Sequence, residues 1–216
     1  ATHNNVLLAC HHLSSYNNHC YSHLRTMSST AQRLGQISGI LNATQSASSS
    51  LVLPAKPYKV CVIGSGNWGT TIAKVVAEST AENPKLFAPL IHMWVFEEKI
   101  NGRKLTEIIN TEHENPDYFP GLALPHDLVA STDADEVMDG AELVVLAVTS
   151  QSLRENLSRW HIPPDAVLLS LAKGIELGTG LRMSEMIAEV TGVDAERIAV
   201  LTGPNLSREI AARQPA

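Results

Sequence analysis

The stretch YKVCVIGSGNWGTTIAKVVA, residues 58–77, decides the fold of this chain. The β-branched run from Val60 to Ile63 predicts a short buried strand, and the apolar-periodic segment after the glycines predicts a helix. Between them stand three glycines with the spacing Gly64-x-Gly66-x-x-Gly69. A strand, a glycine turn and a helix in this order are the fingerprint of a dinucleotide-binding unit.

Each of these glycines has its own expected task. Gly64 lets the chain turn sharply out of the strand, and Gly66 leaves no Cβ between the backbone and a pyrophosphate. Gly69 lets the helix pack close to the strand, while the first amides of the helix face the negative charge. The stretch therefore predicts a phosphate-binding loop at the end of the first strand.

The composition argues against several other classes of protein. Of 216 residues, 44% are hydrophobic and 18% are charged, which is ordinary for a soluble globular protein. A net charge of −6 without a basic stripe argues against nucleic-acid binding. No run approaches the ~18 consecutive apolar residues of a membrane-spanning helix. Three cysteines, Cys10, Cys20 and Cys61, cannot all pair and show no CxxC spacing, which indicates a reducing compartment.

Residues 1–57 differ in composition from the rest of the chain. No Asp or Glu occurs before Glu78, and the segment is rich in Ser and Asn with a few basic residues. Its low hydrophobicity and lack of periodicity predict a disordered leader. An acid-free, weakly basic, Ser-rich leader resembles an organellar transit peptide. The alternatives are a flexible extension, or upstream sequence outside the natural protein with Met27 as the true start.

Strand and helix patterns alternate along residues 58–216. After the first pair, strands are expected at 91–96, 128–131, 141–148, 166–171 and 198–201. Helices are expected at 101–113, 133–138, 151–160, 181–190 and from 205 onward. This alternation predicts an α/β fold with a Rossmann-type, doubly wound parallel sheet. Ligands of such sheets bind outside the carboxyl ends of the strands, where the strand order reverses.

That rule directs attention to the residues that follow the expected strands. Phe96 and Glu97 end the second strand, where an acid normally accepts a hydrogen bond from the adenosine ribose. An acid in place of an Arg favours NAD over NADP, although Glu97 follows Gly69 by more than the usual interval of about 20 residues. Phe96 fits either core packing or contact with adenine.

One further residue is a candidate for chemistry, and two histidines are not. Lys173 follows the strand expected at 166–171, where a cation could meet an anionic substrate. His113 and His126 have no partners at metal-ligand spacing, so a metal hydrolase is a poor alternative and no metal site is predicted.

The segments around these candidates resemble the soluble NAD-dependent glycerol-3-phosphate dehydrogenases of eukaryotes, most closely the fungal branch. They are KVCVIGSGNWGTTIAK (59–74), MWVFEE (93–98), KLTEIIN (104–110) and YFPG (118–121). From about residue 143 the resemblance is to the bacterial enzymes of the same family. It is carried there by VTSQSLR (148–154), AKGIE (172–176) and TGPNL (202–206).

The resemblance implies NAD as cofactor and assigns residues to its site. The implied cofactor-binding residues are Gly64, Ser65, Gly66, Asn67, Trp68, Gly69, Phe96, Ser152 and Pro204. Ser152 stands where the eukaryotic branch has a second aromatic contact, and Pro204 where it usually has Ala. Lys173 matches a family lysine that touches the substrate. The implied reaction is reduction of dihydroxyacetone phosphate to sn-glycerol 3-phosphate, or its reverse, in a cytoplasmic homodimer. An organelle is the alternative compartment if the leader is a transit peptide.

The resemblance also predicts what this chain lacks. In the family, the proton-shuttling lysine and the Arg and Asn that hold the substrate phosphate belong to an all-α C-terminal domain. The sequence ends at Ala216, in the helix expected after the last strand, so no catalytic residue is expected within it. The expected organisation is a leader at 1–57 and an NAD-binding domain at 58–216. A non-catalytic dinucleotide-binding module and a related two-domain hydroxyacid dehydrogenase are the alternatives.

Overall fold

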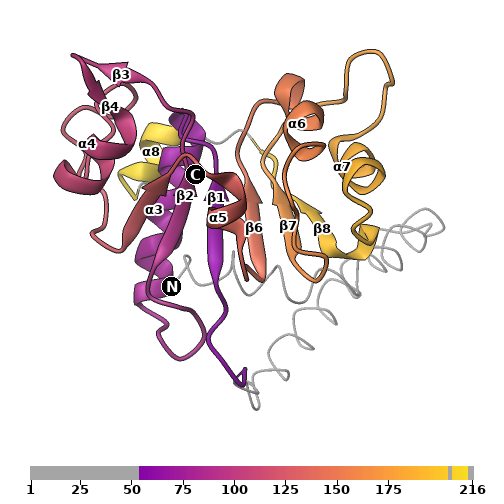
Figure 1. The fold of residues 1–216 in the computed structure, drawn as a ribbon, viewed down its shortest axis with the longest axis horizontal. Helices are drawn as coiled ribbons and strands as arrows, with labels where there is room; N and C mark the ends of the chain where they lie inside the picture. Colours follow the sequence, from indigo (N-terminus) through magenta and orange to yellow (C-terminus); the bar gives the residue numbers. More distant parts are fainter. Residues whose placement is uncertain (1–53, 204–205, 214–216) are drawn as a thin grey trace, which may run out of the picture. The chain divides into compact units, whose positions relative to one another are not determined.

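Six parallel strands form the central sheet of the computed structural model, which describes residues 54–203 and 206–213. The strands are β1 (Val60–Ile63), β2 (Ile91–Trp94), β5 (Leu128–Ser131), β6 (Leu143–Leu146), β7 (Val167–Ser170) and β8 (Ile198–Val200). Their order is β5-β2-β1-β6-β7-β8. The order reverses between β1 and β6 (Figure 1), so the predicted doubly wound sheet is confirmed.

Helices cover both faces of this sheet. They are α3 (Asn67–Ala81), α4 (Leu105–Glu112), α5 (Ala134–Met138), α6 (Ser150–Leu157), α7 (Met183–Thr191) and α8 (Ser207–Ala211), with a 3-10 turn, η1 (Ala195–Arg197). In Figure 1, α5, α6 and α7 lie on the face turned toward the viewer, and α3 and α8 lie behind the sheet. Strands covered on both faces must be apolar throughout, which explains the unbroken apolar runs of β1 and β6.

Successive side chains of β1 enter the two halves of the core. Cys61 and Ile63 pack with the inner sides of α5, α6 and α7, and Val60 and Val62 face the other way. All four are fully buried. Burial raises the pKa of the Cys61 thiol to about 12, so this cysteine stays a neutral packing residue.

The helix predicted at 101–113 is wrong in its first turn. β3 (Lys99–Ile100) and β4 (Arg103–Lys104) form a small antiparallel hairpin, and α4 begins only at Leu105. The turn residues Asn101 and Gly102 have φ of 50° and 83°, both in the left-handed region that a tight hairpin turn requires. Asn-Gly is the strongest short signal for such a turn, so the sequence contained the information.

The other predicted elements are present; β1 and β5 have the expected bounds, and the remaining strands of the large sheet are shorter than expected. For example, β6 covers 143–146 where 141–148 was expected, because the flanking residues are already in loops. The described residues from Lys56 onward belong to one compact unit. None of the helices in the described part of the chain is long and apolar enough to cross a membrane. The leader prediction falls on residues that lie, up to residue 53, outside the described part.

Candidate dinucleotide-binding site

The glycine loop leaves β1 at the point where the strand order reverses. The Gly64 amide donates to the carbonyl of Trp94 in β2 at 3.1 Å, and the Ala147 amide, just after β6, donates to the carbonyl of Ile63 at 2.8 Å. The loop therefore begins between β2 and β6 at their carboxyl ends. This is the position at which open parallel sheets bind their ligands.

Two of the three glycines are required by close packing inside the chain. Gly64 has φ of 126°, and a Cβ there would lie 2.7 Å from the carbonyl oxygen of Ala147. A Cβ on Gly69 would lie 2.2 Å from the carbonyl oxygen of Gly64. This geometry fits the turning and packing tasks expected of the two residues.

Gly66 has no such internal reason to be glycine. A Cβ built on it meets no atom within 4 Å, and its φ of −68° with ψ of −175° is extended backbone that any residue adopts. The space over Gly66 is therefore open. A ligand that lies against the backbone would account for the missing side chain.

Helix α3 starts at this open space with its amides unpaired. Gly66 is the N-cap, no side chain caps the helix, and no acidic residue stands in the first turn. Within the described residues, the backbone amides of Gly66, Asn67 and Trp68 donate no hydrogen bond. Free amides and the helix dipole together make such an end attractive to phosphate. The Asn67 side chain is exposed, and the buried Nε1 of Trp68 has no partner in the described part of the chain.

Buried polar side chains hold the inner side of the glycine loop through hydrogen bonds. The hydroxyl of Thr70 donates to the carbonyl of Ser65 at 3.0 Å, and the amide of Asn115 donates to the same carbonyl at 3.0 Å. Asn115 also donates to the Thr70 hydroxyl at 2.9 Å. Sequence reasoning missed Asn115, because it lies 45 residues beyond Thr70 and outside the helices, strands and site residues that the sequence predicts.

Phe96 stands free at the end of the second strand. Its side chain is 66% exposed, which excludes the core-packing alternative that the sequence left open. An exposed aromatic ring just beyond β2 is available to a flat ligand such as a base.

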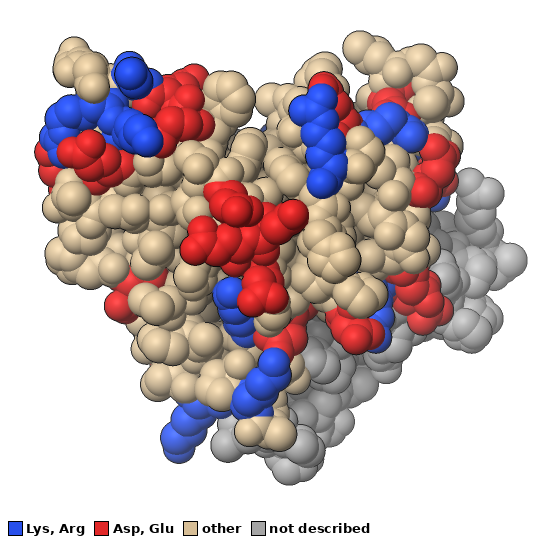
Figure 2. Space-filling view, viewed as in Figure 1, with Lys and Arg blue, Asp and Glu red and all other residues tan. Residues whose placement is uncertain are grey.

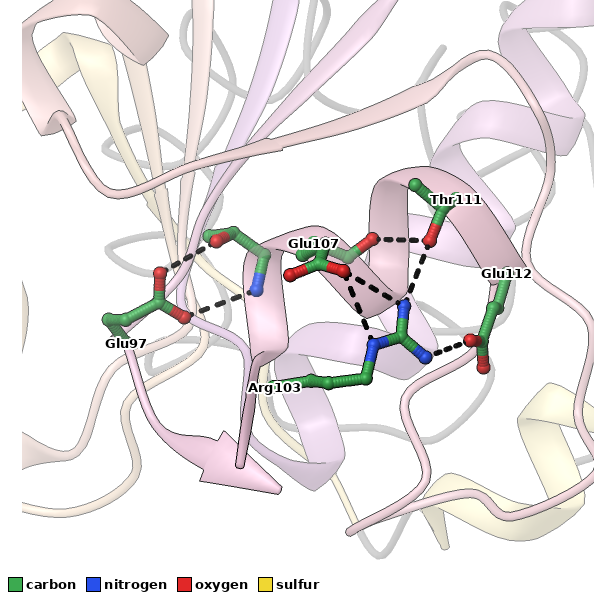
Figure 3. A network of polar contacts seen from close by, with 6 residues as sticks. Glu97, Arg103, Glu107, Thr111 and Glu112 are labelled. Atoms are coloured by element: carbon green, nitrogen blue, oxygen red, sulfur yellow. Dashed lines mark hydrogen bonds and ion pairs between the residues drawn. The ribbon is translucent and has the colours of Figure 1, made fainter. Parts of the chain in front are cut away.

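The carboxylate of Glu97 is already hydrogen-bonded within the protein. Its carboxylate accepts hydrogen bonds from the Thr106 amide at 3.2 Å and from the Thr106 hydroxyl at 2.6 Å, at the start of α4. Figure 3 shows Glu97 on one side of this helix start and Arg103 on the other. Arg103 is paired with Glu107 at 3.2 Å and with Glu112. Its charge is thus shared between two carboxylates, which disfavours an additional phosphate at Arg103.

The carboxyl ends of β6 and β7 carry side chains that are paired with one another. The hydroxyls of Ser152 and Thr149 lie 2.8 Å apart in the first turn of α6. Arg154 donates to both oxygens of Glu176 at 2.6 and 2.9 Å, and this guanidinium lowers the pKa of Glu176 to about 2. A groove of about 560 Å³ lies over them, lined by Ser150, Gln151, Arg154, Glu155, Ser158, Ile175, Glu176 and Leu177.

Lys173 reaches from the end of β7 to the turn after β8. Its exposed ammonium donates to the Gly203 carbonyl at 3.1 Å, so the structure brings Lys173 beside the turn that precedes Pro204. Pro204 itself lies outside the described residues.

Metal-binding candidates have structural explanations. The rings of His113 and His126 stack edge to face with centroids 4.0 Å apart. Figure 2 shows an acidic patch in the middle of the viewed face, over α5. There Asp133 caps α5 by accepting from the Asp135 and Glu136 amides. In the part of the chain that the structure describes, no three His, Cys, Asp or Glu residues are grouped to hold a metal ion.

Comparison with known proteins gives one consistent result. The family described as NAD-dependent glycerol-3-phosphate dehydrogenase N-terminus matches residues 59–216. Glycerol-3-phosphate dehydrogenase 1 of Saccharomyces cerevisiae, named NAD(+)-dependent, is 45% identical over 192 residues, which are 86% of this chain and 48% of the yeast protein. The Corynebacterium glutamicum enzyme, named NAD(P)+-dependent, is 51% identical over 159 residues, or 73% of this chain and 44% of that protein.

A solved structure agrees with these sequence matches. The yeast glycerol-3-phosphate dehydrogenase structure superposes with a TM-score of 0.67 at 45% identity, covering 73% of this chain and 45% of the yeast chain. The chain thus spans about half the length of the curated relatives it matches.

The sheet order and the open glycine loop define a Rossmann-type dinucleotide-binding domain. Beyond that class, the chain belongs to the NAD-dependent glycerol-3-phosphate dehydrogenase family, of which it matches the N-terminal part. Its relatives carry dehydrogenase names, so the family is one of oxidoreductases.

Proposed function

We propose that this chain binds NAD(H) with the pyrophosphate over the glycine loop. The observation that carries the proposal is the unpaired start of α3, where no side chain competes for the first amides and Gly66 leaves the approach open. Gly64, Ser65, Gly66, Asn67, Trp68 and Gly69 form this part of the site. Their backbone supplies the hydrogen bonds, so binding requires little rearrangement.

The adenosine end is proposed to lie beyond β2. The ring of Phe96 is proposed to stack on adenine, which suits an aromatic side chain that is 66% exposed. Glu97 at the helix start and the pairing of Arg103 with two carboxylates favour NAD over NADP, because a 2′-phosphate would meet negative charge. Ser152 and Pro204 are proposed as contacts toward the nicotinamide end.

The proposed reaction is the reduction of dihydroxyacetone phosphate to sn-glycerol 3-phosphate and its reverse. The cofactor supplies the hydride in such a reaction. Within this chain, Lys173 is proposed to attract the anionic substrate, since its ammonium is exposed at the carboxyl end of β7. No proton-transferring residue is assigned here, and the catalytic groups are proposed to come from an all-α domain outside this sequence.

A titration of the purified chain with NADH and with NADPH, followed by nicotinamide fluorescence, tests the proposal. We expect NADH to bind, and NADPH to bind several-fold more weakly. The matched control is Gly66→Val, whose Cβ would enter the open space without meeting another part of the protein within 4 Å. A folded wild-type chain that binds neither nucleotide would overturn the proposal.

The reaction itself needs a second assay. With dihydroxyacetone phosphate and NADH, we expect little or no turnover by this chain. We expect turnover by a protein that joins this chain to the all-α domain of a relative. Turnover of another hydroxy acid by such a protein, with none of glycerol 3-phosphate, would favour the related hydroxyacid dehydrogenase instead. A homodimer and a cytoplasmic location are proposed for the full-length protein on the resemblance, and are tested on that protein by solution mass and by cell fractionation.

A further inference from the structure

A fully buried asparagine lies beneath the loop proposed to bind the pyrophosphate. Asn115 is 0% exposed, and its two amide N–H groups donate to the Ser65 carbonyl and the Thr70 hydroxyl at 3.0 and 2.9 Å. The Thr70 hydroxyl donates to the same Ser65 carbonyl at 3.0 Å. The three groups form a closed ring in which every donor proton is used and the carbonyl accepts twice.

This ring fixes the peptide that joins Ser65 to Gly66. In a trans peptide unit the C=O and the N–H point in opposite directions, and the described residues contain no cis peptide. Because the Ser65 carbonyl is held toward the interior, the Gly66 N–H is turned outward. That N–H has no partner among the described residues, and a Cβ built on the same residue meets no atom within 4 Å.

We propose that Asn115, acting with Thr70, is a positioning residue that aims the Gly66 N–H at the pyrophosphate of a bound dinucleotide. This role rests on the proposed function of the loop. Asn115 touches no ligand itself. It acts through the orientation of one peptide unit, which a loop without this anchor could rotate.

Asn115 also leaves one buried polar atom without a partner, which good packing alone would not require. Its Oδ1 is buried without a partner among the described residues. An unpaired buried acceptor destabilises a fold, and an apolar residue of similar size would avoid that cost. Such a residue could not hold the Ser65 carbonyl, so the asparagine is better explained by the geometry of the loop than by stability.

Asn110 in α4 provides a matched control. Its side-chain amide donates to the Ala130 carbonyl at 2.9 Å and accepts from the Ala130 amide at 2.8 Å, tying α4 to strand β5. It is the same residue type, anchors backbone in the same way and makes no contact with the glycine loop. A general effect of losing such an anchor would appear in both residues.

The experiment compares Asn115→Asp with Asn110→Asp in the purified chain. Both changes keep the side-chain shape and remove the amide donor. Dissociation constants are measured for NADH and for ADP-ribose, which contains the pyrophosphate but no nicotinamide, together with thermal unfolding. We expect Asn115→Asp to weaken both ligands by a similar factor of about ten or more. Asn110→Asp is expected to bind both as the wild type does, even if its Tm is lower.

A second pair of variants keeps the test decisive if Asn115→Asp does not fold. Thr70→Val removes the hydroxyl from the ring with little change of shape, and Thr70→Ser retains it. We expect several-fold weaker binding of both ligands for Thr70→Val and recovery for Thr70→Ser. If Asn115→Asp folds and binds both ligands as the wild type does, the role is overturned. If Asn115→Asp does not fold, the same result for folded Thr70→Val overturns it. A folded wild-type chain that binds neither ligand would overturn the proposed function, and this role with it.

Discussion

The two halves of the sheet end in opposite ways at the proposed site. After β1, the loop leaves backbone amides without partners among the described residues, and the buried side chains of Asn115 and Thr70 hold its inner side. After β6 and β7, polar side chains already have partners within the protein. Arg154 pairs with Glu176 and Glu189, the Ser152 hydroxyl with that of Thr149, and the Lys173 ammonium with the backbone carbonyl of Gly203.

This difference indicates which half supplies the binding free energy. Backbone groups fixed by a fold meet a ligand without losing side-chain freedom. Side chains that already pair on the surface must exchange one partner for another, which gains little. We therefore expect the β1–β2 half to bind most of the dinucleotide and the β6–β7 half to contribute weakly until a substrate or a further domain is present.

Among the variants that test this difference, Gly69→Ala should have the largest effect, and it should act on the stability of the β1 half. Its Cβ would lie 2.2 Å from the backbone oxygen of Gly64, so α3 must move away from the end of β1. We expect a loss of unfolding free energy of about 3 kcal/mol, as for overpacked core positions. Urea unfolding measures it. Gly66→Ala is the control, because its Cβ meets no atom within 4 Å, and equal stability of the two variants would contradict the prediction.

Gly66→Val should weaken NADH binding, whereas Gly69→Ala should weaken the fold. The valine fits the extended backbone of Gly66 but occupies the space proposed for the pyrophosphate. We expect NADH affinity to fall about a hundredfold, or roughly 2.7 kcal/mol. The unfolding free energy should change by no more than about 0.5 kcal/mol. Fluorescence titration and urea unfolding on the same sample separate the two effects. Tight NADH binding by this variant would show that the ligand does not lie over Gly66.

Phe96→Ala should have a smaller effect and leave the fold intact. The ring is 66% exposed, so its removal creates no cavity and should leave Tm unchanged. Stacking of a base on an aromatic ring contributes about 1–3 kcal/mol, so NADH affinity should fall about tenfold or somewhat more. Phe96→Tyr retains the ring and should bind as the wild type does. If Phe96→Ala lowers Tm but not affinity, the ring has a packing role instead.

The glycine loop and the sheet could be predicted because their causes are local in sequence. A spacing of three glycines between a strand and a helix specifies backbone geometry, and the observed φ of Gly64 and the close approach at Gly69 follow from it. Apolar runs predicted the strands because both sheet faces are covered. The Asn101-Gly102 hairpin was missed although its signal was present, because the helix predicted from the following residues was begun at residue 101, four residues too early.

The anchor beneath the loop could not be predicted in the same way. Asn115 meets Ser65 only through the tertiary path of the chain after α4, and no spacing rule connects residues 50 positions apart. The hydrogen bonds of Glu97 to the start of α4 also depend on the tertiary path of the chain. Its place after β2 suggested a ribose contact, but the hairpin turns Thr106 back toward its carboxylate. Exposure excludes core packing for Phe96, which the sequence left open, and its contact with adenine stays a prediction.

The smallest predicted effect belongs to the paired side chains of the other half. Because Arg154 holds the pKa of Glu176 at about 2 rather than 4.5, the pair stabilises the fold fully above about pH 4.5. That contribution is lost as the pH falls toward 2, where the folded-state carboxylate is protonated. Glu176→Gln should therefore lower Tm at neutral pH, by about 2 °C or less because the pair is only partly buried and Arg154 keeps Glu189 as a partner.

The Tm difference between Glu176→Gln and the wild type should shrink steadily when thermal unfolding is repeated at lower pH. A difference that stays constant from neutral pH to about pH 3 would contradict the assigned pair. NADH affinity measured on the same variant sharpens the comparison of the two halves. Unchanged affinity is expected if the β1–β2 half dominates. A clear loss would mean that the groove over Arg154 and Glu176 binds the nicotinamide end more strongly than its paired side chains indicate.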